Sequence, residues 1–343
     1  MFKFKFLTSL IIFSFLLILT SFVKNQTREI EKKINSNNKT INIKEKDLNE
    51  SQLDYYYLTS PLVLDGAMGT ELNKRGVQTK LPLWTAESNI SHPYLVEQIH
   101  KEYIQSGADI ITTNTFRSTS WSYMRAGFTG ANAQLKAKDS LYSAVECAHK
   151  ASKGMVKVAG SITTLNDCYE PEKFPGRNIA IDTYGQTLDW LIDSGIDIIL
   201  FETMGNLEEI DIGLSLSSKY RKSIWLSVIM KSKKEILDGT FIEKILFLAN
   251  QYPVDAILIN CNNILSTIVS LKIVQTHWVK KWGAYPNLGV NDYSNEYSNI
   301  IAKTQFISGM KNILNLKPNI IGCCCGSTPY HINLLKSLIK RNK

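Results

Sequence analysis

Three of the six cysteines in this chain are placed where they could bind one metal ion together. Cys261 ends one apolar run, and Cys324 and Cys325 end another, within the segment GCCCG at 322–326. Zn²⁺ prefers four tetrahedral ligands, and a site with three protein ligands leaves one position for a substrate. Cysteine is also among the most frequently buried residue types. The spacing alone therefore leaves two interpretations, a zinc site or three buried structural cysteines.

A zinc site with an open position would act on a thiol. Free thiols have a pKa of about 8.5 and are mostly protonated at neutral pH, whereas a thiol bound to zinc gives up its proton. The thiolate is the nucleophile that accepts a methyl group. On the zinc interpretation, Cys261, Cys324 and Cys325 would bind a Zn²⁺ ion that activates a thiol substrate. Cys323 should point to the other side of its strand and is expected to be a small core residue.

Eight apolar runs alternate with segments of helical length from residue 61 onward. The runs span residues 61–68, 108–116, 156–162, 197–204, 223–230, 255–263, 282–289 and 319–326. Continuous apolar runs are typical of strands that are covered on both faces. Amphipathic segments such as 93–107 and 132–152 lie between them, and this alternation predicts a parallel sheet. Eight units without a glycine-rich nucleotide-binding motif favour a closed (β/α)8 barrel, the TIM barrel, over an open doubly wound sheet.

Polar residues fall at the carboxyl ends of these runs. They are Asp65, Thr113, Asn114, Glu202, Cys261, Asn287 and Cys324. In a (β/α)8 barrel these ends converge on the rim where active sites are built. The sixth and eighth runs flank the seventh on one side of that rim, so the three cysteines could share one ion.

Composition and charge exclude two classes of protein. The net charge is +8 over 343 residues, without a basic stripe that carries interleaved aromatic residues, so no nucleic-acid partner is expected. Half of the six cysteines are adjacent in a long chain, which does not suit the disulfide framework of a small secreted domain. Metal ligation in a reducing compartment suits these cysteines better.

The N-terminal segment differs from the rest of the chain. Residues 6–23 are uncharged and follow two lysines, which is typical of a signal anchor or a signal peptide within residues 1–23. We favour an uncleaved anchor, because 20–23 offers no A-x-A pattern for a cleavage site; an extension without a function is the alternative. Residues 24–58 are expected to be a flexible polar linker. Residues 59–343 would form the barrel, in the cytoplasm, because more basic residues follow the apolar segment than precede it.

From about residue 61 to residue 339 the chain resembles the homocysteine S-methyltransferase family. The matching motifs are LDGAMGTEL (64–72), TNTF (113–116), FETM (201–204), INC (259–261), YPNLG (285–289) and GCCCGSTPYHI (322–332). The last motif is the most specific. The family pattern there is Gly-Gly-Cys-Cys-Gly, and this chain has Cys323 in place of the second glycine. A glycine permits close backbone approach, so Cys323 is a departure that bears on the loop geometry.

The resemblance implies a zinc-dependent methyltransferase with a defined site. The implied zinc ligands are Cys261, Cys324 and Cys325. The implied substrate-binding positions are Asp65, Gly66, Ala67, Met68, Thr113, Asn114 and Glu202. Asp65 and Glu202 would face the ammonium group of homocysteine, which needs anions once it is desolvated; a structural ion pair or a helix cap is the alternative. The backbone around Gly66–Met68 would hold the carboxylate.

The methyl donor is the least constrained part of this interpretation. We expect no folate or cobalamin domain after the barrel. A barrel of this length resembles the family members that use a sulfonium donor, S-methylmethionine or S-adenosylmethionine, to make methionine. Betaine is the second candidate, because Trp84, Trp121 and Tyr285 could form an aromatic cage for a quaternary ammonium group. Two alternatives are another thiol or selenol acceptor and a non-catalytic, membrane-tethered barrel that keeps zinc. The expected partners are small molecules, with membrane attachment through residues 6–23 as a further expectation.

Overall fold

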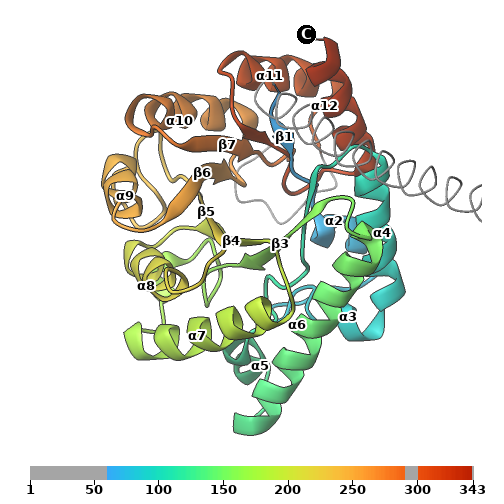
Figure 1. Ribbon diagram of the computed structural model, residues 1–343, viewed down its shortest axis with the longest axis vertical. Coiled ribbons are helices and arrows are strands. Elements are labelled where there is room, and N and C mark those ends of the chain that lie inside the picture. The colour runs from blue at the N-terminus through green and yellow to red at the C-terminus, as the bar shows by residue number, and fades with distance from the viewer. Residues whose placement is uncertain (1–59, 290–299, 342–343) are drawn as a thin grey trace, which may run out of the picture. The chain divides into compact units, whose positions relative to one another are not determined.

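Eight parallel strands form a closed barrel in the computed structural model, which describes residues 60–289 and 300–341 (Figure 1). The strands are β1 (Leu62–Val63), β2 (Ile110–Thr112), β3 (Lys157–Ile162), β4 (Ile198–Met204), β5 (Ser223–Val228), β6 (Val254–Asn260), β7 (Lys281–Tyr285) and β8 (Ile320–Ile321). Hydrogen-bonded neighbours follow the order β1-β8-β7-β6-β5-β4-β3-β2. Leu64 pairs with Ile110 in a parallel bridge, and the Asp109 N–H donates to the Val63 carbonyl at 2.8 Å. These contacts bring β1 against β2 and close the barrel.

Helices alternate with the strands and surround them in Figure 1. They are α2 (Met68–Lys74), α3 (Ser88–Ser91), α4 (Pro93–Gln105), α5 (Ser120–Arg125), α6 (Gly130–Ser152), the short 3-10 helix η1 (Pro171–Lys173), α7 (Arg177–Asp193), α8 (Leu207–Ser217), α9 (Ile242–Ala249), α10 (Ile264–His277), α11 (Lys303–Asn315) and α12 (Pro329–Arg341). The helices expected at 93–107 and 132–152 correspond to α4 and α6.

The sequence explains how these elements begin and which face they bury. Helix α4 begins with a proline at its first position, where the missing N–H costs nothing. Its buried residues Val96, Ile99, His100 and Tyr103 recur at the spacing of one helix face. Helix α8 begins where the Asn206 side chain accepts the Glu209 N–H at 3.0 Å. Local capping and periodicity therefore agree with the packing.

The strands bury side chains on both of their faces. Alternate residues point into the barrel, such as Ile198 and Leu200 of β4 and Ala256 and Leu258 of β6, and they form the inner core cluster. The residues between them face the helices and belong to the larger outer cluster. This two-sided burial is the physical reason why parallel strands appear in the sequence as continuous apolar runs.

The predicted (β/α)8 TIM barrel is confirmed, because each of the eight apolar runs overlaps one strand. The first and the last strand are shorter than their runs, so Asp65 and the three adjacent cysteines lie in the turns that follow β1 and β8. The expected anchor at 6–23 and linker at 24–58 lie outside the described residues. Within residues 60–289 and 300–341, no helix is long and apolar enough to cross a membrane.

Candidate active site

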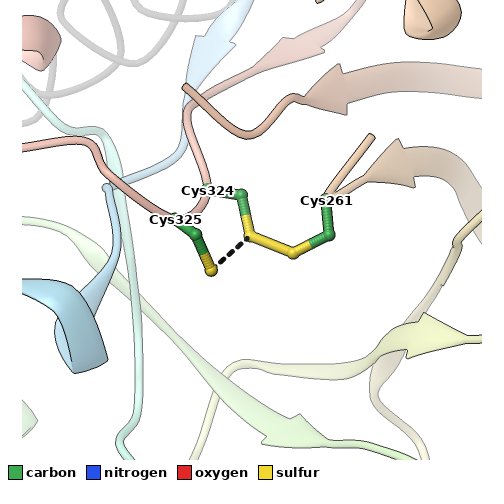
Figure 2. Close-up of side chains that lie close together, drawn as sticks. All are labelled: Cys261, Cys324 and Cys325. Atoms are coloured by element: carbon green, nitrogen blue, oxygen red, sulfur yellow. Dashed lines mark hydrogen bonds between the residues drawn. A yellow bond between two sulfur atoms is a disulfide. The ribbon is translucent and has the colours of Figure 1, made fainter. Parts of the chain in front are cut away.

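The sulfur atoms of the three predicted metal ligands converge at the carboxyl end of the barrel. The Sγ atoms of Cys261, Cys324 and Cys325 all lie within 4.8 Å of one another (Figure 2). Cys261 follows β6, where its N–H donates to the Tyr285 carbonyl at 3.3 Å. Cys324 follows β8, where its N–H donates to the Pro286 carbonyl at 2.8 Å. Strand β7 thus joins the two cysteine-bearing turns, as the barrel geometry predicted.

Two of these sulfur atoms are bonded to each other. Cys261 and Cys324 form a disulfide with their Cα atoms 5.7 Å apart, and the Cys325 Sγ lies 3.9 Å from the Cys324 Sγ. The sequence predicted three free thiolates, and the structure differs from this prediction because two of the three sulfur atoms form a disulfide. Its physical reason is proximity, because side chains that converge on one point are also close enough to be oxidised. Metal binding by all three requires reduction of this bond by two electrons, after which three thiolates match the ligand set that Zn²⁺ prefers.

All ten predicted site residues line one cavity of about 180 Å³. Asp65 and Glu202 are among them. Both oxygen atoms of Asp65 accept hydrogen bonds from Thr112, from the N–H at 2.8 Å and from the hydroxyl at 2.9 Å. Glu202 accepts the hydroxyl of Ser161 and, at 3.3 Å, the hydroxyl of Tyr285. The structure therefore brings the two carboxyl groups and the three cysteines together.

Burial changes the charge of these two carboxyl groups. It raises the pKa of Asp65 to about 8, and repulsion from Glu202 adds to this increase. Burial also raises the pKa of Glu202 to about 7, although the hydrogen bonds from Ser161 and Tyr285 oppose the change. Two buried carboxylates without a cation are unfavourable. A cationic group in the cavity would stabilise both ionised forms, which suits the binding of an ammonium.

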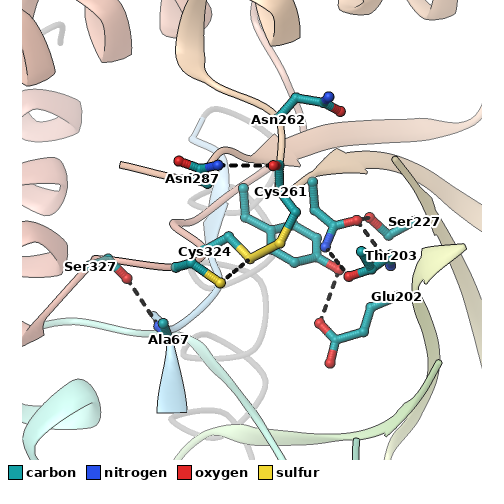
Figure 3. Close-up of a disulfide and its surroundings, with 12 residues drawn as sticks. Ala67, Glu202, Thr203, Ser227, Cys261, Asn262, Asn287, Cys324 and Ser327 are labelled. Carbon is teal, nitrogen blue, oxygen red and sulfur yellow. Dashed lines mark hydrogen bonds between the residues drawn. A yellow bond between two sulfur atoms is a disulfide. The ribbon is translucent and has the colours of Figure 1, made fainter. Parts of the chain in front are cut away.

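The turn at Gly66–Met68 is held from the other end of the chain. The Ala67 N–H donates to the Ser327 Oγ at 3.0 Å, and the Tyr103 hydroxyl donates to the Ala67 carbonyl at 3.0 Å. The expected cradle of N–H groups is thus partly occupied by Ser327 (Figure 3). A Cβ atom on Gly66 would lie 2.6 Å from the Ser327 Oγ, so glycine is needed for this close approach.

Thr113 and Asn114 line the cavity, but their polar atoms hold the surrounding loops. The Thr113 hydroxyl accepts the Ser161 N–H at 3.1 Å. The Asn114 side chain accepts the Thr85 hydroxyl at 2.6 Å and donates to the Asn89 Oδ1 at 2.8 Å. The structure therefore gives these two side chains positioning contacts within the protein.

Two of the three aromatic residues considered for a betaine cage line the cavity. Trp84 and Tyr285 line the cavity, and Tyr285 donates its hydroxyl to Glu202. Trp121 is not among the described residues that line the cavity, and its indole N–H donates to the Asn166 Oδ1 at 2.9 Å. Cys323, expected in the core, is 2% exposed and packs in the outer cluster, with part of its surface at the cavity.

Sequence reasoning missed two groups of residues at this site. The first lines the same cavity and includes Arg117, Asp167 and Cys168. The second is a buried support, in which the Asn260 Oδ1 accepts the Thr203 N–H at 3.1 Å and the Ser227 hydroxyl at 2.7 Å. A signal for Asn260 was present, since an amide at the end of an apolar strand needs partners. No comparable signal marked Arg117.

Comparison with known proteins agrees with this geometry. The profile of the family described as homocysteine S-methyltransferase matches residues 62–339. The Homocysteine S-methyltransferase of Escherichia coli is 27% identical over 302 residues, which cover 80% of this chain and 94% of that protein. The Selenocysteine Se-methyltransferase of Brassica oleracea is 26% identical and covers 81% of this chain and 89% of its own length.

Solved structures show the same likeness. The metallated form of the Escherichia coli homocysteine methyltransferase MmuM is 26% identical, with a TM-score of 0.71, and covers 81% of this chain and 96% of that one. Its oxidized form has a TM-score of 0.70, with 81% and 95% covered. The match to the family profile spans the barrel. It includes the three convergent cysteines, the two buried carboxyl groups and the turn at Gly66–Met68. This chain therefore belongs to the homocysteine S-methyltransferase family.

Proposed function

We propose that this chain transfers a methyl group from a sulfonium donor to the thiol of L-homocysteine and so forms methionine. The observation that carries the proposal is one cavity that holds three convergent cysteine sulfurs beside two buried carboxyl groups. The sulfurs suit a metal that activates a thiol, and the carboxyl groups suit the ammonium of an amino acid. Homocysteine carries both groups on one small molecule.

The chemistry is a single displacement. A lone pair of the homocysteine thiolate forms the new S–CH₃ bond while the C–S⁺ bond of the donor breaks. The bonding electron pair returns to the donor sulfur, which becomes a neutral thioether. With S-methylmethionine as donor, both products are methionine, and the thiol proton is released. S-Adenosylmethionine is the other sulfonium candidate, and betaine is less well supported because Trp121, one of the three aromatic residues of its expected cage, is not among the described residues that line the cavity.

The residues of the chain divide this task. Reduced Cys261, Cys324 and Cys325 would hold Zn²⁺, which when bound supplies a Lewis acid that lowers the pKa of the substrate thiol. Asp65 and Glu202 orient the substrate through its ammonium group. Holding the sulfur and the methyl carbon in line is itself a large contribution to the rate. Because the site needs reduced thiols, we place the reaction in a reducing compartment such as the cytoplasm.

The test uses the full chain, reduced and supplied with zinc. Deuterium-labelled homocysteine is mixed separately with S-methylmethionine, S-adenosylmethionine and betaine, and labelled methionine is measured by mass spectrometry. We expect labelled methionine with at least one sulfonium donor, and one zinc ion per chain. Cys324→Ser should lose most of the methionine formation and most of the bound zinc. Cys147→Ser, on α6 and outside the cavity, should keep both the activity and the zinc. Bound zinc without labelled methionine from any donor would contradict the proposed function.

The acceptor is the second point to test. A relative of this chain is named for selenocysteine, and a selenol would fit the same sulfur-lined cavity. Selenocysteine is therefore offered in competition with homocysteine. A kcat/KM for homocysteine that is the higher of the two supports the assignment of the acceptor.

A further inference from the structure

Arg117 is a buried cation that lines the same cavity as Asp65 and Glu202. Its side chain is 3% exposed and lines the cavity. The Nη1 atom donates to the Thr164 carbonyl at 2.9 Å and to the Asn166 carbonyl. The guanidinium carbon lies 5.2 Å from the centre of the Phe116 ring. These contacts fix the position of the guanidinium group.

Asp167 and Glu209 attract the fixed guanidinium only from beyond ion-pair distance. Its Nε atom is buried without a hydrogen-bond partner. Among residues 60–289 and 300–341, no carboxylate oxygen lies within 4.0 Å of it. Backbone carbonyl groups satisfy N–H donors but carry no net charge, and a buried charge without a counter-ion is strongly unfavourable. This part of the cavity therefore suits an anion.

The position of Arg117 relates it to the methyl donor. Cys168, which also lines the cavity, interacts electrostatically with both Arg117 and Cys325. Cys168 is thus close to a predicted metal ligand and to the guanidinium group. Asp167, which lines the same cavity, attracts Arg117 from beyond ion-pair distance. An amino acid whose sulfonium points toward the cysteines could place its carboxylate at Arg117 and its ammonium near Asp167.

We propose that Arg117 binds the carboxylate of the methyl donor and so selects sulfonium donors that are themselves amino acids. This inference rests on the proposed function. Arginine suits the role because its planar fork matches the two oxygen atoms of a carboxylate. Rejection of a donor without the carboxylate follows, since such a donor leaves the guanidinium buried and unpaired.

The experiment compares two donors that differ only in the carboxylate. They are S-methylmethionine and its decarboxylated analogue, (3-aminopropyl)dimethylsulfonium. We expect the wild type to show a kcat/KM about 100-fold higher for S-methylmethionine, which is the loss typical of an unpaired buried charge. Arg117→Gln should reduce this preference to about 3-fold or less, and the KM for homocysteine should change little. Arg125→Gln, which removes an exposed arginine of α5, should keep the full preference.

The outcomes separate the proposal from a purely structural role of Arg117. If its only task is to hold the Thr164 and Asn166 carbonyl groups, Arg117→Gln lowers kcat/KM for both donors by the same factor, and the proposal is overturned. It is also overturned if the wild type uses both donors equally well. If Arg117→Gln fails to fold, Arg117→Lys replaces it and should keep part of the preference. If the wild type forms no methionine from either donor or from any other donor, the proposed function itself is contradicted.

Discussion

Asp65 and Glu202 should release protons when an amino acid enters the cavity. Burial raises the pKa of Glu202 to about 7 and that of Asp65 to about 8. At pH 7, about half of the Glu202 side chains and about nine-tenths of the Asp65 side chains are then protonated. An ammonium group bound between them favours both ionised forms. We therefore expect the binding of L-methionine at pH 7 to release about 1.4 protons, and its affinity to increase as the pH rises from 6 to 8.

Calorimetric titration in buffers of different ionisation enthalpy measures this number directly. L-Methionine is chosen because it has no thiol proton to add to the count, and the chain is used reduced and supplied with zinc. Glu202→Gln removes one titrating group and also the negative charge that raises the pKa of Asp65. Its proton release should therefore fall below about 0.9. Glu208→Gln, which changes an exposed residue of α8, should leave the wild-type value unchanged.

Two results would refute this reasoning. A release below about 0.3 protons in the wild type would mean that both carboxyl groups are already ionised before the ligand binds. An equal release in Glu202→Gln and the wild type would mean that Glu202 does not sense the ammonium. A ligand without the amino group, 4-(methylthio)butanoate, serves as the internal control. It should release far fewer protons than L-methionine.

Two further predictions concern stability and packing. Gly66→Ala places a Cβ 2.6 Å from the Ser327 Oγ and 2.8 Å from the Tyr103 hydroxyl, so it should lower the free energy of unfolding by about 1–3 kcal/mol and raise the KM for homocysteine. Gly185→Ala on α7, where a Cβ meets open space, should cost no stability; equal losses in urea titrations would contradict the steric argument. Burial lowers the pKa of His100 from 6.5 to about 3, so the unfolded chain takes up a proton near pH 6.5 that the folded chain takes up only near pH 3. Stability is then lost as the pH falls below 6.5, by about 2 kcal/mol between pH 8 and pH 5 from this residue. His100→Phe should remove that part of the pH dependence. The prediction is contradicted if urea titrations of the variant and the wild type show the same change in the free energy of unfolding between pH 8 and pH 5.

The fold was predictable because its strands are buried on both faces. Such strands leave apolar runs that need no alignment to be seen, and all eight runs overlap a strand. The rim residues were predictable for the same reason, since Asp65, Glu202 and Cys261 interrupt or end apolar runs where burial alone would favour an apolar residue. The prediction of three zinc ligands came from this placement together with the family motif, and the structure brings their sulfur atoms within 4.8 Å of one another.

The remaining features depend on contacts between distant parts of the chain. The Ala67 N–H is occupied by a side chain 260 residues away, which no local pattern indicates. Arg117 follows the TNTF motif and would be taken from sequence as an exposed arginine, because arginine is rarely buried. Its Nη1 donates to the carbonyl groups of Thr164 and Asn166, which lie 47 and 49 residues further along the chain. The disulfide likewise depends on the distance between two turns.

The turns that carry the site are held in an unusual backbone conformation by two asparagine side chains. Within the described residues, Trp84, Thr203 and Cys261 combine a positive φ, of 51°, 58° and 58°, with a place on the cavity wall. A left-handed conformation costs a residue other than glycine about 1–2 kcal/mol, and it is rarer still for a β-branched residue such as Thr203.

Hydrogen bonds offset this cost at two of the turns (Figure 3). Thr203 directly follows Glu202 in the chain. The Asn260 side chain accepts the Thr203 N–H at 3.1 Å and donates to the Thr203 Oγ1 at 2.8 Å. Asn287 donates to the Cys261 carbonyl at 3.1 Å. Because a bend at these points aims one carboxylate and one sulfur into the same cavity, the strain positions the site. The motifs FETM, INC and YPNLG therefore belong together physically, since each contains either a strained residue or the asparagine that holds it.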